Sequence, residues 1–248
     1  MSPFMLATLG GLISFGSTAF GSALAMLRFP GHRFEPWRLP IDFALGLMIS
    51  AVAFSLVGPA ALEAWGDWHR LAPIGLGFYA GILMIAVLHR LLRRFEGAKG
   101  HQGQLLLALV LMVHNFPEGL AAGAALVGLD SAHARTVLGS IALQNIPEGL
   151  LMVACLRALG VSVLLSFAGG VGSGLIELFG GMGAGLLLRE SAVLLPFLLA
   201  TAGGAMLTSV VLELGEGASV KKRVLNSRFA MGLVSVPVLN GMIGLLNF

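Results

Sequence analysis

The sequence predicts an all-α integral membrane protein: a bundle of eight transmembrane helices with both termini outside. Of the 248 residues, 57% are apolar and only 11% are charged, whereas soluble domains are about a quarter charged. Apolar runs long enough to cross hydrocarbon recur along the whole chain. The basic residues lie in the short connections between these runs rather than on one face, which argues against a nucleic-acid partner.

The first three spans are predicted at 3–26, 40–62 and 72–93. We expect the first to be retained, because no Lys or Arg precedes it as in a signal peptide. Trp65 and Trp68 lie between the second and third spans, where aromatic side chains anchor helices at the membrane interface.

The other five spans follow with short connections, so the chain is predicted to be a single transmembrane domain over 1–248. The joins near 159 and 189 are so short that the helices on either side should be antiparallel neighbours. The many glycines of the sixth span should permit close helix packing. These five spans are predicted at 104–127, 132–158, 160–187, 191–212 and 228–247.

The positive charges predict the orientation. Of the fifteen Lys and Arg residues, only Arg70, Arg135 and Arg189 follow even-numbered spans, and the other twelve follow odd-numbered spans. Positively charged connections face the cytoplasm, so the odd-numbered connections are predicted to be cytoplasmic. The compact loops suit a bacterial inner (plasma) membrane.

Four ionisable side chains fall deep within predicted spans. The carboxylates are Glu118, Glu148 and Glu177, one in each of three consecutive spans, and the histidine is His114. An ionised group in the membrane costs several kcal/mol unless it has a partner, so such residues mark functional sites. A shared cation would explain all three carboxylates.

A repeated motif strengthens this interpretation. The segment His114–Gly119 reads His-Asn-Phe-Pro-Glu-Gly, and Gln144–Gly149 reads Gln-Asn-Ile-Pro-Glu-Gly. In each copy the first residue and the glutamate are four positions apart, so they share one helix face, and the asparagine and the glutamate are three apart. Each glutamate could therefore serve two ligand sets, as a bridged two-metal site requires.

The prolines of the motif predict kinks in the fourth and fifth helices. Pro117 and Pro147 each remove a helical hydrogen bond, which leaves the carbonyls of Val113 and Leu143 without their usual partners. In lipid such a carbonyl must find another partner. Interrupted helices near the midplane are typical of transporter binding sites.

The chain resembles the ZIP family of divalent-metal transporters, most closely its bacterial GufA-like branch. The two motif copies carry most of the resemblance. Ser173-Gly-Leu-Ile-Glu177 resembles the Ser-Gly-x-x-Glu pattern of the family's sixth helix, and Leu45-Gly-Leu-Met48 resembles its second helix. The resemblance implies transport of zinc, and also of cadmium or iron(II), toward the cytoplasm, without catalysis and without a cofactor other than the bound ion. A homodimer in the lipid bilayer is common among relatives.

The resemblance also implies the ligands. A first set would be Met48, His114, Glu118, Gln144 and Glu148. A second set would be Asn115, Glu118, Asn145, Glu148 and Glu177, with both glutamates bridging. The softer donors of the first set favour it as the transport site.

Two departures from the family pattern affect these expectations. Asn145 stands where related proteins can carry aspartate, so the second site is weaker or structural. Glu213 and Glu216 are candidates for the exit route, but their segment lacks the histidine and proline that the family often has there.

Two other functions stay open on the residues alone. An intramembrane metal-dependent hydrolase would also bring histidine and glutamate together, although the His-Glu-x-x-His pattern is absent. A metal-binding sensor is the second alternative.

Overall fold

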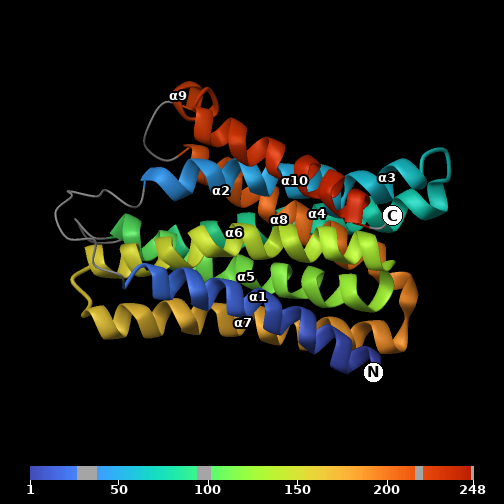
Figure 1. Ribbon diagram of the computed structural model, residues 1–248, viewed down its shortest axis with the longest axis horizontal. Coiled ribbons are helices and arrows are strands. Elements are labelled where there is room, and N and C mark those ends of the chain that lie inside the picture. The colour runs from blue at the N-terminus through green and yellow to red at the C-terminus, as the bar shows by residue number, and fades with distance from the viewer. Residues whose placement is uncertain (27–37, 94–101, 216–219, 247–248) are drawn as a thin grey trace.

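The computed structural model describes residues 1–26, 38–93, 102–215 and 220–246, and within them every regular element is a helix (Figure 1). The long helices are α1 (Pro3–Leu24), α2 (Arg38–Ala51), α4 (Trp68–Arg93), α5 (Gln102–Gly128), α6 (Ser131–Ala158), α7 (Val163–Glu190), α8 (Leu195–Gly215) and α10 (Ser227–Leu246). The short ones are a π-helix η1 (Val52–Leu56), α3 (Gly58–Glu63), a 3-10 turn η2 (Ala192–Leu194) and α9 (Val220–Val224).

The predicted helical membrane bundle is confirmed. Among the described residues, seven segments are long and apolar enough to cross a membrane: Pro3–Leu24, Ile41–Glu63, Trp68–Leu91, Ser131–Ala158, Val163–Glu190, Leu195–Gly215 and Ser227–Leu245. The remaining predicted span, 104–127, corresponds to the 27-residue helix α5. That α5 is an eighth span stays a prediction.

The second predicted span, 40–62, is not one regular α-helix. Its centre is the π-helix η1, where the Val57 N–H donates to the carbonyl of Val52, five residues back, at 3.0 Å. Pro59 follows at the start of α3 and has no N–H to continue the α-helical pattern. Glycine is required at position 58, because a Cβ there would lie 1.8 Å from the Ala53 carbonyl oxygen.

The helices form two groups that meet along α5 and α6. Helices α1, α5, α6 and α7 pack against one another, while α2 pairs with α10 and α4 pairs with α8. The two groups are joined mainly where α5 contacts α8 and α6 contacts α2. Figure 1 shows α1, α5, α6 and α7 as one layer and α2, α8 and α10 as another.

The glycine-rich sixth predicted span, 160–187, corresponds to helix α7. The close helix packing predicted for it is confirmed. A Cβ at Gly180 would lie only 2.4 Å from the Phe116 carbonyl oxygen of α5. Without side chains between them, the backbones of α5 and α7 come into direct contact.

Basic residues gather at one end of the bundle. The end of α6 carries Arg157, and α9 carries a run of three basic residues, Lys221–Arg223, at the same end. The beginning of α1 and the end of α10 lie at the other end, with the α3–α4 and α7–α8 connections (Figure 1). The structure thus agrees with the predicted up-and-down arrangement, and which end faces the cytoplasm stays a prediction.

Helix contact through glycine gives a first testable prediction. A Cβ at Gly21 of α1 would lie 2.0 Å from the Ile146 carbonyl oxygen of α6, whereas a Cβ at Gly16 would have no neighbour within 4 Å. Gly21→Ala should therefore lower stability by about 1–3 kcal/mol through overpacking. Gly16→Ala, on the same helix, is the control and should not destabilise. The temperature at which the detergent-solubilised protein loses its monodisperse size-exclusion peak measures both, and equal temperatures for the two variants would contradict the packing.

Candidate metal centre

The two motif copies meet inside the bundle, on neighbouring stretches of α5 and α6. The His114 Nε2 atom lies 3.3 Å from Glu148 Oε2 and 4.0 Å from Glu118 Oε1. One ligand atom from each of these three residues lies within 4.8 Å of the others. All three side chains are buried. The sequence prediction that His114 and the two glutamates converge is confirmed as geometry.

The residue after each glutamate brings a third helix close. A Cβ at Gly119 would lie 1.9 Å from the Glu177 carbonyl oxygen of α7, and a Cβ at Gly149 would lie 2.1 Å from the Thr18 carbonyl oxygen of α1. In each Pro-Glu-Gly sequence the glutamate is therefore followed by a glycine at which the helix touches the backbone of a neighbouring helix. Both helices continue through Pro117 and Pro147, and the predicted kinks stay predictions.

No Lys or Arg of the described residues pairs with the carboxylates of this cluster. Among the described residues, the ion pairs of Glu118 and Glu148 are with His114 alone. Two buried carboxylates without Lys or Arg would be strongly unfavourable in an apolar bundle. A cation at the cluster would supply the missing charge.

The same cluster carries a surplus of acceptors. In the described part of the chain, seven buried side-chain oxygens have no hydrogen-bond partner, and five of them belong to the motif copies. Buried polar atoms are normally paired, because an unpaired one costs about 1–3 kcal/mol. The five atoms are Asn115 Oδ1, Glu118 Oε2, Gln144 Oε1, Asn145 Oδ1 and Glu148 Oε1.

The three amides share one arrangement. Gln144 Nε2 donates to Glu118 Oε1 at 2.8 Å, and Asn115 Nδ2 donates to the Ser173 carbonyl oxygen at 3.2 Å. Asn145 Nδ2 donates to Glu177 Oε2 at 2.7 Å. In each amide the nitrogen is held by the protein and the oxygen has no partner, as expected if the oxygen is kept for a ligand.

Glu177 lies in a different environment, which includes α1. Its carboxylate accepts hydrogen bonds from the hydroxyls of Ser14 and Thr18 and from the amide of Asn145. The sequence reasoning missed Ser14 and Thr18. Their spacing of four residues, which places both hydroxyls on one face of an apolar span, was the available signal.

Met48 is buried with an exposed fraction of 3% in the apolar core that α2 forms with α5, α6 and α8. Burial and a thioether do not distinguish a ligand from a packing residue. Its role as a metal ligand stays a prediction.

The candidate exit residue Glu213 is paired. Arg223 of α9 lies 3.6 Å from Glu213 Oε1 and donates to the Glu213 carbonyl oxygen at 2.7 Å. Its Nε also donates to Asp42 Oδ1 of α2 at 3.0 Å. Arg223 therefore ties α2, α8 and α9 together at the basic end of the bundle. The second exit candidate, Glu216, lies outside the described residues.

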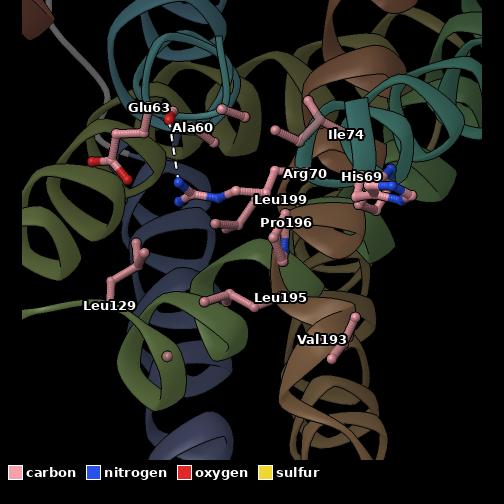
Figure 2. A pocket seen from close by; sticks show the side chains of 13 residues that line it. Ala60, Glu63, His69, Arg70, Ile74, Leu129, Val193, Leu195, Pro196 and Leu199 are labelled. Atoms are coloured by element: carbon pink, nitrogen blue, oxygen red, sulfur yellow. Dashed lines mark hydrogen bonds between the residues drawn. The ribbon is translucent and has the colours of Figure 1, made fainter. Parts of the chain in front are cut away.

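A cavity of about 420 Å³ lies at the opposite end, between α3, α4 and the start of α8 (Figure 2). Its polar lining is Glu63, His69 and Arg70, and the Arg70 guanidinium donates to the Glu63 carbonyl oxygen at 3.3 Å. None of the predicted metal ligands lines this cavity. The buried metal-type donors are thus separate from it.

Two known proteins are similar to this chain. A zinc transporter of Myxococcus xanthus named GufA is 36% identical over 167 residues, which cover 62% of this chain and 66% of that protein. A zinc transporter of Bordetella bronchiseptica named ZIPB is 32% identical over 215 residues, which cover 81% of this chain and 69% of that protein. The chain thus spans slightly less than two thirds of the length of the first relative. No protein-family model matches it.

The Arg223 cluster yields a stability prediction. Arg223→Gln removes a guanidinium that is 11% exposed and that pairs with both Asp42 and Glu213. Loss of charge-assisted hydrogen bonds should cost about 1–3 kcal/mol, measured as an earlier thermal loss of the monodisperse peak in detergent. Lys222→Gln removes an equal charge from an exposed position on the same helix and is the control. If both variants lose the same stability, net charge and not the cluster is responsible.

Proposed function

This chain belongs to the ZIP family of divalent-metal transporters, and we propose that it carries divalent transition-metal ions, zinc foremost, through a site between α5 and α6. The ion would bind His114, Glu118, Gln144 and Glu148, with Asn115 and Asn145 beside them and Met48 completing the set from α2. Cadmium and iron(II) would use the same donors.

One observation carries the proposal: the buried oxygens without partners gather on the same two motif copies as the buried histidine and carboxylates. A protein without a ligand for these atoms would lose stability at each of them. A divalent cation would accept electron pairs from these oxygens and would balance the negative charges of the two carboxylates. These interactions would offset the hydration that the cation loses on binding.

The chemistry of the donors favours transition metals. Imidazole nitrogen suits zinc, iron and copper, whereas magnesium and calcium prefer sites made of oxygen alone. Zinc is also named as the transported ion of both relatives. A site with one histidine and two bridging-capable carboxylates fits Zn²⁺ in charge and in ligand type.

We further propose that the ion moves from the end that holds the α3–α4 connection toward the basic end, which would face the cytoplasm. The excess of Lys and Arg in the connections at that end supports this direction. Glu213 lies along this route near the basic end, and Arg223 would have to release its carboxylate before it could contact an ion.

The proposal predicts metal uptake into liposomes that contain the purified protein. Wild type should take up Zn²⁺ in a saturable manner, and His114→Ala and Glu148→Ala should each reduce initial uptake at least about tenfold, because each removes a direct ligand. A zinc-sensitive fluorophore inside the liposomes measures the rate. Cd²⁺, Fe²⁺ and Mn²⁺ tested in parallel would rank selectivity.

Matched controls separate the site from general effects of mutation. His133→Ala removes a partly exposed histidine at the start of α6, and Glu190→Ala removes an exposed carboxylate at the end of α7. Both should transport at the wild-type rate. Unchanged uptake in His114→Ala would remove the proposed site, and stoichiometric zinc binding without uptake would favour a sensor.

A further inference from the structure

We propose that Glu177 positions Asn145 and does not itself bind the transported ion. The Glu177 carboxylate, held by Ser14 and Thr18 of α1, would fix the Asn145 amide with its nitrogen toward α7 and its oxygen free as a ligand. This inference rests on the proposed function, and it changes the role that family resemblance gives to Glu177.

Both oxygens of the Glu177 carboxylate already accept hydrogen bonds within the protein. The Ser14 hydroxyl and the Asn145 amide both donate to Oε2, and the Thr18 hydroxyl donates to Oε1. Glu118 and Glu148 differ, because each keeps one oxygen without a partner. An ion that bound Glu177 would have to compete with donors that α1 and α6 supply.

Glu177 also lies apart from the three residues that form the ligand cluster. The ligand atoms that lie within 4.8 Å of one another come from His114, Glu118 and Glu148, and Glu177 is not among them. Glu177 is fully buried, with an exposed fraction of 0%. Its carboxyl group is therefore held where it lies by three hydrogen bonds from α1 and α6.

The orientation of the Asn145 amide depends on its contact with Glu177. Its Nδ2 donates to Glu177 Oε2 and, at 2.9 Å, to Ser14 Oγ. A rotated amide would place its oxygen against the carboxylate, where two acceptors repel each other. The carboxylate therefore holds the amide in one orientation, and Asn145 Oδ1 is turned away from Glu177, buried and without a partner. That oxygen is the atom available to a cation.

A double-mutant cycle on zinc binding tests the inference. The Kd and the number of bound ions are measured by equilibrium dialysis of the detergent-solubilised full chain with Zn²⁺ alone, for Glu177→Gln, Asn145→Ala and the double variant. If Glu177 acts through Asn145, each single change should weaken binding about tenfold, as orienting residues do, with the number of ions unchanged. The double variant should then bind no more weakly than Asn145→Ala.

A second set of variants keeps the test valid if Glu177→Gln does not fold. Replacing Ser14 and Thr18 together by alanine should weaken zinc binding when Asn145 is present and have no effect in the Asn145→Ala background. Ser17→Ala is the matched control on α1, because that hydroxyl donates only to the Ile13 carbonyl of its own helix.

The outcomes are distinct. Loss of one bound ion in Glu177→Gln, or losses of affinity that multiply in the double variant, would show Glu177 to be a ligand and overturn the inference while zinc transport stands. A wild-type protein that neither binds nor transports zinc would overturn the proposed function and this inference with it.

Discussion

The fold has to accommodate two buried carboxylates, and several oxygens without hydrogen-bond partners, inside an apolar bundle. Glu118 and Glu148 are buried against a single histidine, and the surrounding amides turn their nitrogens to the protein and leave their oxygens free. Such an arrangement is unfavourable for the protein alone. A divalent ion bound there, as proposed, would make it favourable, and the cost in stability without the ion would become affinity for the ion.

The helix packing makes this arrangement possible. Glycine at 119 and at 149 lets the backbones of α7 and α1 approach the two glutamates directly. Helix α1 thereby brings the hydroxyls of Ser14 and Thr18 to Glu177, which joins α1, α6 and α7 around one carboxylate. Met48 of α2 packs in an apolar core to which α5, α6 and α8 also contribute.

Sequence periodicity and motif spacing predicted the helical membrane bundle, and they predicted that His114, Glu118 and Glu148 converge, because residues four apart share a helix face whatever the helix packs against. Family membership, too, followed from the motif pair and is confirmed by two relatives. The spacing of Ser14 and Thr18 marks a polar face on α1, but it could not predict Glu177 as their partner, since a hydroxyl in an apolar span carries no sign of what it contacts. The break at 52–56 was missed because length and hydropathy do not distinguish a π-helix from an α-helix. The pairing of Glu213 with Arg223 depends on how α9 folds back, which local pattern does not determine.

The most direct measurement of the central claim is anomalous X-ray diffraction at the zinc edge from crystals of the zinc-loaded protein. The account predicts a zinc peak about 2.0–2.1 Å from His114 Nε2, with oxygens of Glu118 and Glu148 at similar distances. Zinc bound at other residues of the loaded protein, with no peak between α5 and α6, would contradict it.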